Sequence, residues 1–487
     1  MKKVYFNEYN IPMGRTVYLP LVSGMLTAYA KTFPLLRESY EFMQPIYERD
    51  TPTKILEQYE DPAVACFSVC LWNYNLSLEV ARLVKEKWPT CTVIFGGPSA
   101  PFESLPANVD YVINGEGEKK FVNILCPGLV DEGQEKDLDI YPSPYTSGEY
   151  DSMLGEMNFQ AIIETNRGCP FTCTYCFWGQ GGLSQKMRFH SLDHIRDEAE
   201  WIGRNKIKYV FCADANFGMF GRDVEVAKIY AAVKKKYGYP DKFRVCYGKN
   251  AQESIYKTAK ILHKAGLAKA ITLSKQTNNP DALKNIRRSN IKSSVYDYLQ
   301  ERYNAEDIPT YVELILGLPG ETLQSFKNGV QEAIKTKTNL LIYHCSVLPN
   351  TEMAKEAYKE KHGIKTIRLP MCEIHCSPRG PGAVQEYEDI IIGTNTMTTE
   401  EWIEAAVYSW MIQLRYSLGV NCKDNEIVPA FYRIAREITE GKARGQIDEM
   451  FGDIYWEPEE LAYLKIMYKD GDPVKFAREH ILYGRKG

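Results

Sequence analysis

Residues 158–350 alternate between short apolar segments typical of strands and longer amphipathic segments typical of helices. Because a helical pattern separates each strand from the next, consecutive strands are expected to run parallel. Six such units predict a partial (β/α)6 barrel, whose chemistry lies on loops at the carboxyl ends of the strands. The expected strands are 159–165, 207–213, 242–248, 268–274, 310–316 and 340–346.

A second alternation of the same kind occupies residues 1–130. Its segment AVACFSVCLW (63–72) is apolar nearly throughout, as in strands buried on both faces. An amphipathic stretch at 76–88 and a further strand pattern, CTVIFGG (91–97), follow it. We therefore expect a Rossmann-like open parallel sheet with helices on both faces, which binds its ligand beyond the carboxyl ends of the strands.

The rest of the chain differs in composition from these two α/β units. Residues 131–157 are acidic, rich in proline, serine and glycine, and poor in aliphatic residues, which indicates a linker. Within 351–487 strand patterns fade and helical ones dominate, so we expect a mostly helical region that caps the substrate pocket. A chain of 487 residues is too long for one ordinary core, in agreement with this division.

The overall charge and hydropathy exclude several classes of protein. The net charge is −4 and the pI about 6.1, so we expect no nucleic-acid partner. No apolar segment approaches the roughly 20 residues that span a bilayer, and the opening MKKVYFNEYN does not resemble a signal peptide. We expect a cytoplasmic protein with no membrane partner, whose 13 cysteines remain thiols.

Three of the cysteines lie together in RGCPFTCTYCFWG (167–179), directly after the first predicted barrel strand. Thiolates of Cys169, Cys173 and Cys176 can hold three irons of a cubane and leave the fourth iron open. Two alternatives are weaker. A structural zinc site needs four ligands, usually in two separated pairs, and three purely structural cysteines would be unusual in a loop with glycine and proline.

The segment CPFTCTYC followed by Phe177 resembles the signature of the radical S-adenosylmethionine (SAM) family. The resemblance implies one 4Fe–4S cluster with SAM chelated at its open iron, Phe177 against the adenine, and reductive cleavage of SAM to a 5′-deoxyadenosyl radical. It also implies an electron donor such as flavodoxin or ferredoxin. An oxygen-sensitive iron–sulfur enzyme is therefore expected.

Further SAM contacts are implied where the family's motifs match the ends of later strands. Asp214 and Asn216 stand in CADANFG, where the family often has Gly-Gly-Glu, so this chain departs from the usual pattern. Ser274 and Gln276 follow the fourth strand, and Glu313 is expected to face the barrel interior from the fifth. The LGLPGE segment after that strand is equally compatible with a simple turn.

The amino-terminal unit resembles the cobalamin-binding domain that is fused to some radical SAM barrels. SVCLWNYN (68–75), IFGGPSAP (94–101) and NGEGE (114–118) carry the resemblance, and ordinary packing is the alternative for any one residue. No histidine precedes His190, so cobalamin without a histidine lower ligand is expected. The implied contacts are Ser68, Leu71, Trp72, Tyr74, Gly96, Gly97, Pro98, Ser99, Gly115 and Glu116.

The two cofactors together imply a cobalamin-dependent radical SAM methyltransferase. Such an enzyme would use two SAM molecules to methylate an unactivated carbon, less commonly phosphorus, of a small molecule or peptide. Cyclisation or rearrangement is the alternative activity, and a cobalamin or Fe–S sensor is the non-enzymatic one. CEIHCSPRGPG (372–382) offers Cys372, His375 and Cys376 as an incomplete metal site, so a loop without metal is favoured there.

Overall fold

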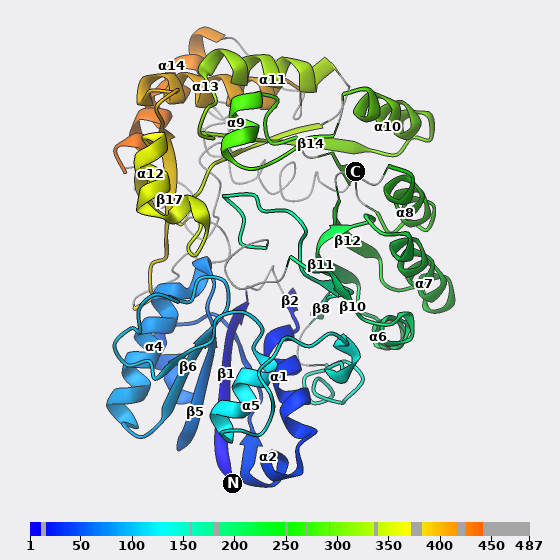
Figure 1. The fold of residues 1–487 in the computed structure, drawn as a ribbon, viewed down its shortest axis with the longest axis vertical. Helices are drawn as coiled ribbons and strands as arrows, with labels where there is room; N and C mark the ends of the chain where they lie inside the picture. Colours follow the sequence, from blue (N-terminus) through cyan, green and yellow to red (C-terminus); the bar gives the residue numbers. More distant parts are fainter. Residues whose placement is uncertain are drawn as a thin grey trace.

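Figure 1 shows a computed structural model in which the amino-terminal sheet lies below a larger βα assembly, with their strand ends turned toward each other. The fold is α/β, as predicted from the alternation of strand and helix patterns. The structure describes residues 1–10, 16–155, 158–178, 185–248, 252–268, 270–273, 275–291, 293–335, 339–371, 382–416 and 424–441.

The amino-terminal sheet is parallel and has the order β3-β1-β5-β6-β7, with β4 also paired to β1. This confirms the open parallel sheet predicted from the sequence. The strands are β1 (Lys2–Asn10), β3 (Tyr40–Phe42), β4 (Ile46–Glu48), β5 (Pro62–Ser68), β6 (Thr92–Gly96) and β7 (Tyr111–Val112).

Helices cover both faces of this sheet because successive side chains of a strand point to opposite faces. On β5, Val64 and Cys66 pack with the residues of α1 and α5, whereas Ala65 and Phe67 pack with those of α3 and α4. The near-continuous apolar pattern of the segment follows from this two-sided burial. The helices are α1 (Leu21–Lys31), α2 (Pro34–Ser39), α3 (Pro52–Glu57), α4 (Tyr74–Lys87) and α5 (Glu118–Leu125).

All six strands predicted for the second unit are present, in two parallel sheets. The first has the order β12-β11-β8-β2 and the second β13-β14-β15, and Phe243 N donates to Leu267 O (3.0 Å) where they adjoin. The predicted strands are β8 (Asn158–Ile163), β11 (Tyr209–Phe217), β12 (Lys242–Tyr247), β13 (Ile271–Thr272), β14 (Thr310–Leu316) and β15 (Asn339–His344).

One strand of the second unit comes from the amino-terminal part of the chain. Strand β2 (Thr16–Tyr18) pairs in parallel with β8, with Thr16 opposite Asn158. Three residues are too few to show a periodicity of their own, so this pairing was not predicted.

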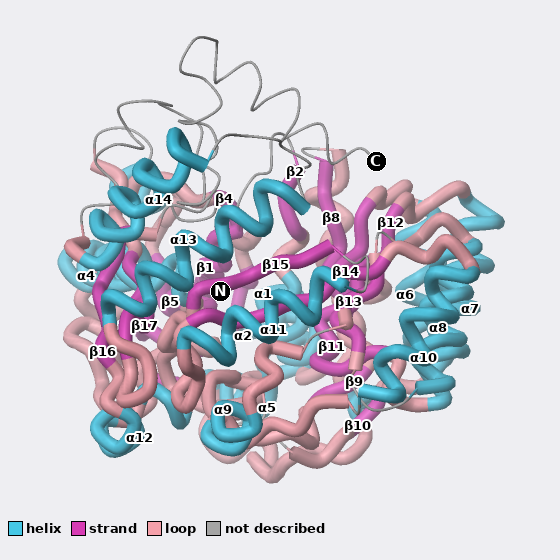
Figure 2. Tube along the Cα trace, turned by 90° about the horizontal axis from the view of Figure 1, so that it is seen from above, coloured by secondary structure: helices cyan, strands magenta, loops and turns pink. Residues whose placement is uncertain are grey.

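The outside of the second unit is covered by a row of helices, most of which form a column in Figure 1 and lie along one side in Figure 2, whereas the last, α11 (Leu323–Lys335), lies across the top of Figure 1. Each helix packs its apolar face on the shared core. The row leaves the carboxyl ends of the strands open toward the amino-terminal sheet. Its members are α6 (Leu192–Arg204), α7 (Gly221–Tyr237), α8 (Gln252–Lys264), α10 (Ser293–Ala305) and α11 (Leu323–Lys335).

The described part of the chain after residue 350 is mostly helical, as expected, but it also contains two strands that the fading strand pattern did not reveal. Strands β16 (Lys365–Pro370) and β17 (Tyr387–Gly393) form an antiparallel pair, and Ile391 N donates to Cys345 O (2.9 Å), just beyond β15. β16 was missed because KTIRLP mixes charged and apolar residues without regular alternation. The helices here are α12 (Glu356–His362), α13 (Thr399–Tyr416) and α14 (Asp424–Thr439). Cys372, His375 and Cys376 lie outside the described residues.

The predicted linker at 131–157 packs against both units. Leu138 and Tyr141 are buried in the core of the amino-terminal sheet, whereas Tyr145 and Tyr150 are buried in that of the second unit. The domain boundaries themselves remain a prediction. Among the described residues, no helix is both long and apolar enough to cross a membrane.

Candidate active site

The loop with the three cysteines begins just beyond β8, at the carboxyl end of the strand. Gly168 turns the chain at a φ of +108°, a conformation that favours glycine. Thr174, in the middle of the loop, is fully buried. Its N–H donates to Ile286 O (3.1 Å), and its carbonyl accepts from Met353 N (2.9 Å). The backbone between Cys173 and Cys176 is therefore fixed by two neighbouring segments.

All three cysteines line one cavity of about 180 Å³. The residues that share it come from the cysteine loop and from the carboxyl ends of neighbouring strands. The spacing of the cysteines in the sequence thus brings three sulfur atoms to one hollow, as the prediction requires. The lining residues are Cys169, Phe171, Cys173, Tyr175, Cys176, Trp178, Ala215, Asn216, Cys246, Tyr247, Gln276 and Arg288.

The chemistry of this donor set suits an iron–sulfur cluster. Burial raises the pKa of the Cys173 thiol, and that of Cys176 to about 11, so both are protonated at neutral pH without a metal. Iron binding would displace those protons, since thiolate is the ligand form. Asn216 Nδ2 donates to Cys169 Sγ (3.2 Å) and so adds the hydrogen bond to sulfur that tunes such clusters.

Two of the predicted SAM residues, Asn216 and Gln276, line the cavity. Gln276 has a φ of +66°, which is uncommon for a residue other than glycine. Its backbone is held on both sides, because Gln276 N donates to Glu313 O (2.9 Å) and Ile315 N donates to Gln276 O (2.8 Å). The backbone of this lining residue is therefore held in an uncommon conformation.

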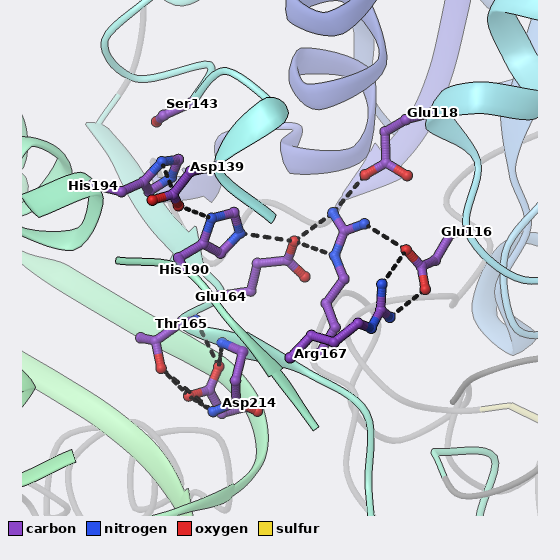
Figure 3. Close-up of polar contacts among 12 residues, drawn as sticks. Glu116, Glu118, Asp139, Ser143, Glu164, Thr165, Arg167, His190, His194 and Asp214 are labelled. Atoms are coloured by element: carbon purple, nitrogen blue, oxygen red, sulfur yellow. Dashed lines mark hydrogen bonds and ion pairs between the residues drawn. The ribbon is translucent and has the colours of Figure 1, made fainter. Parts of the chain in front are cut away.

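Asp214 is buried, and its carboxylate accepts hydrogen bonds from neighbouring residues of the chain, as Figure 3 shows. The carboxylate accepts from Thr165 N (2.7 Å), Asn166 N (3.2 Å) and Asn166 Nδ2 (2.6 Å), and from the Thr165 hydroxyl. Burial raises the pKa of Asp214 to about 6, although the bonds from Thr165 and Asn166 act in the opposite direction. In this arrangement Asp214 holds the segment that leads into the cysteine loop.

Among the described residues, Glu313 and Phe177 are predicted to contact SAM but do not line the cavity. Glu313 alternates along β14 with buried Val312 and Leu314, so it lies on the barrel-facing side, as expected. Phe177 lies next to Phe102, with ring centroids 6.4 Å apart. Ser274 is outside the described residues. The roles of these residues in SAM binding stay predictions.

Arg288 is a lining residue that the sequence did not reveal. It follows α9 (Pro280–Asn285), is 8% exposed, and its Nη1 donates to Tyr175 Oη (3.0 Å). A buried guanidinium beside three thiols can bind a carboxylate through two parallel bonds. Nothing in the local sequence IRRSN distinguishes this arginine from its neighbour Arg287, which is exposed.

The carboxyl edge of the amino-terminal sheet reaches the cysteine loop. Phe102, which follows β6, meets Phe177 there, and Asn350 Nδ2 donates to the carbonyls of Pro98 (2.9 Å) and Ala100 (2.8 Å). A ligand beyond the ends of β5 and β6 would therefore lie close to the three-cysteine cavity.

Two of the predicted cobalamin residues, Gly96 and Gly97, differ in their surroundings. Gly97 has a φ of +99°, and a Cβ there would lie 2.6 Å from Val69 O, so the glycine is required by a close approach of the chain to itself. At Gly96 the nearest atom to a Cβ would be 3.9 Å away, in Ile113. Gly96 is therefore free of packing constraints, which leaves closeness to a ligand as a reason for it.

The other predicted cobalamin residues lie at or just beyond the ends of the same strands. Trp72 is 37% exposed there, so its ring is accessible to a ligand at this edge. This edge therefore suits a large flat ligand, and individual contacts stay predictions. The remaining residues at these strand ends are Ser68, Leu71, Tyr74, Pro98, Ser99 and Gly115.

Glu116, whose predicted contact with cobalamin stays a prediction, pairs with arginines of the second unit (Figure 3). Its carboxylate binds Arg188, and Arg167 Nη1 at 3.2 Å. Burial alone would raise the pKa of Glu116, but the bond from Arg188 and the charge of Arg167 lower it. Arg167 also pairs with Glu118 (2.5 Å) and Glu164 (2.6 Å). Since Arg167 stands two residues before Cys169, this network joins the two ligand loops.

Comparisons with known proteins agree with this geometry. Residues 163–333 match the radical SAM superfamily. The cobalamin-dependent radical SAM methyltransferase TokK of Streptomyces tokunonensis is 32% identical over 452 residues. The 2-(S-pantetheinyl)-carbapenam-3-carboxylate methyltransferase of Streptantibioticus cattleyicolor is 32% identical over 454 residues. Each alignment covers 85% of this chain and 65% of the relative, so the chain spans just under two thirds of their length.

The fold has a counterpart among solved structures. The radical SAM methyltransferase TsrM of Kitasatospora setae, with cobalamin and a [4Fe–4S] cluster bound, superposes with a TM-score of 0.60 at 13% identity. The match covers 92% of this chain and 100% of that one. It establishes that the two proteins share their fold.

Proposed function

The chain carries a radical SAM domain at residues 163–333, and from that premise we propose that it is a cobalamin-dependent radical SAM methyltransferase. Its substrate would be a small molecule or peptide, methylated at an unactivated carbon, and the reducing cytoplasm would suit its cluster. The observation that carries the proposal is the single cavity lined by Cys169, Cys173 and Cys176 beside the exposed edge of the amino-terminal sheet.

Different residues of the cavity would bind the cluster and SAM. The three thiolates would hold a 4Fe–4S cluster, which when reduced supplies the electron that cleaves SAM. Arg288 is placed to bind the carboxylate of SAM, with the amides of Asn216 and Gln276 available for its polar groups. Phe171, Tyr175 and Trp178 would exclude water around the reacting carbon.

The edge beyond β5 and β6 is the proposed cobalamin site. When bound there, cobalamin would supply the methyl group that the substrate receives. Trp72 would cover one face of the corrin, and the first 189 residues provide no histidine to ligate its cobalt. The Arg167–Glu116 pair would keep the cobalamin loop at a fixed distance from the cluster loop.

An acidic electron donor of the flavodoxin or ferredoxin class is the proposed protein partner. A hollow of about 330 Å³ is lined by Lys284, Arg287, Lys355 and Lys361 against one acid, Glu352. Its positive charge stands out on a chain with a net charge of −4 and would attract such a donor.

The hollow also reaches the cluster loop. Tyr358, which lines the hollow, lies with its hydroxyl 3.1 Å from the Thr174 hydroxyl, and Thr174 adjoins Cys173. An electron arriving at this surface would therefore have a short path to the cluster.

The proposed activity is tested by anaerobic loading with iron, sulfide, cobalamin and methyl-labelled SAM. Small-molecule and peptide substrates, including carbapenams as suggested by the relative, are then screened by mass spectrometry. We expect 5′-deoxyadenosine and a product that gains the labelled methyl. A product rearranged or cyclised without the label would identify the alternative activity. Binding of both cofactors with no turnover of SAM would identify a sensor.

A further inference from the structure

Two histidines and an aspartate form a cluster outside the three-cysteine cavity (Figure 3). His190 precedes α6, His194 lies in its first turn, and Asp139 belongs to the connection between the two units. The Nδ1 atoms of His190 and His194 lie 3.1 and 3.6 Å from the same atom, Asp139 Oδ1. In a tetrahedral zinc site with bonds of 2.0–2.1 Å, two ligand atoms lie about 3.3 Å apart. The two separations observed here lie on either side of that distance.

The other ring nitrogens of both histidines also face carboxylates. His190 Nε2 lies 3.8 Å from Glu164 Oε1, and His194 Nε2 lies 3.3 Å from Glu198 Oε1. Histidines that ligate metals commonly donate their second N–H to a carboxylate in this way.

Neutral histidines cannot satisfy this arrangement. A neutral imidazole has one N–H and one lone pair, so in each ring one lone pair would face a carboxylate oxygen. If only one ring were protonated, one lone pair would still face a carboxylate oxygen. If both were protonated, their positive charges would repel, because the stacked ring centroids lie 4.2 Å apart. One divalent cation at the Nδ1 atoms supplies the same charge and leaves each Nε2–H to its carboxylate.

We propose that Asp139, His190 and His194 bind a zinc ion, with water completing the tetrahedron. Asp139 is already oriented for this role, because Ser191 N donates to both of its carboxylate oxygens (3.1 Å each). Zinc suits two imidazoles and one carboxylate. Binding turns the rings out of their stack so that both Nδ1 lone pairs meet at the ion. The Asp139 side chain is 31% exposed, which leaves the ion a path from solvent.

A second buried group points to the same cluster. Glu198 is 4% exposed, and its Oε2 atom is buried without a hydrogen-bond partner. Its Oε1 accepts from the Ser143 hydroxyl (2.6 Å) and faces His194. The Nε2–H of a zinc-bound His194 would donate a hydrogen bond to the Glu198 carboxylate, which would orient the ring as a zinc ligand. The ion would then tie the connection at Asp139 to α6 of the barrel.

The test uses the full chain with its cluster loaded, so that iron occupies the three cysteines. After treatment with a chelator, zinc is titrated in competition with a fluorescent zinc indicator, and bound metal is counted by mass spectrometry. We expect one zinc ion, whose X-ray absorption shows nitrogen or oxygen neighbours at 2.0–2.1 Å. A sulfur shell near 2.3 Å, or no bound zinc, would overturn the proposal.

Variants locate the ion. Asp139→Asn and His194→Gln should each weaken zinc binding at least tenfold, and Glu198→Gln about 10–100-fold. His263→Gln, in the last turn of α8, is the matched control and should bind zinc as the parent does. Because Asp139 is partly exposed, Asp139→Asn tests the site even if His194→Gln fails to fold. Equal zinc affinity in the parent and in Asp139→Asn would contradict the assignment.

Discussion

Substitution of Asp214 distinguishes a structural carboxylate from one that binds SAM. In Asp214→Ala the backbone N–H groups of Thr165 and Asn166, and the Asn166 amide, lose their acceptor inside the protein. At about 1–3 kcal/mol for each unsatisfied buried donor, the cost for the three donors is about 3–9 kcal/mol. For a cooperative unit of 150–250 residues this corresponds to a fall of about 6–36 °C in the melting temperature.

Asp214→Asn should be nearly neutral, because its neighbours can reverse their roles. The retained oxygen still accepts both backbone N–H groups, and the Thr165 hydroxyl can accept from the new amide. The Asn166 amide can turn over, since its Oδ1 is buried without a partner. The cluster content and the affinity for SAM should therefore stay within about fivefold of the parent, about 1 kcal/mol.

The pH dependence provides a second readout of the same substitution. Burial raises the pKa of Asp214 in the folded chain from 3.8 to about 6, so the parent loses stability as the pH rises from about 4 through 6. The full loss is about 3 kcal/mol, and about half of it falls above pH 5. Asp214→Asn lacks this loss, so its melting temperature relative to the parent should increase between pH 5 and pH 7.5.

Thermal denaturation and equilibrium binding of SAM to the cluster-loaded protein measure both effects. If Asp214→Asn keeps its cluster and its melting temperature but binds SAM more than tenfold more weakly, the carboxylate contacts the ligand. The structural role argued from its hydrogen bonds would then be wrong.

Three further substitutions test other parts of the account. Arg167→Lys should slow methylcobalamin formation, followed by absorbance, more than 5′-deoxyadenosine release, because the pair that joins the two loops is weakened; equal losses would contradict this coupling. Charge reversal by Lys284→Glu and Lys361→Glu should raise the KM for a flavodoxin donor at least tenfold, which corresponds to about 1.4 kcal/mol. The rate with a chemical reductant should stay unchanged. An unchanged KM would show that the donor docks on another surface. Gly97→Ala should lower the melting temperature, because the strained φ costs about 1–3 kcal/mol and the new Cβ clashes with backbone. Gly96→Ala should leave the melting temperature unchanged. Equal stability of the two variants would show that the clash is relieved.

Much of the fold was predictable because its elements have strong local patterns. β5 and β14 are seven residues long and mostly apolar, with Ser68 ending β5 and only Thr310 and Glu313 interrupting β14, so both could be identified as strands. β2 has three residues and owes its position to pairing with β8, and β16 owes its position to β17. Such strands depend on partners distant in the sequence, which a local pattern cannot reveal.

The same distinction applies to the site. Cys169, Cys173 and Cys176 are close in the sequence, so their meeting in one cavity could be predicted. Arg288 and the Arg167–Glu116 pair could not be, because each role depends on contact between distant segments. For Glu116 the loop position suggested a ligand contact, which stays a prediction, but it could not reveal the pairing of its carboxylate with two arginines.

Electron paramagnetic resonance of the reduced, cluster-loaded protein tests the central claim most directly, and it needs no substrate. We predict the spectrum of a 4Fe–4S cluster that changes when SAM is added, and loss of that cluster in Cys173→Ala. A spectrum that SAM leaves unchanged would show that no iron is open to it. An intact cluster in Cys173→Ala would show that these three thiolates are not its ligands.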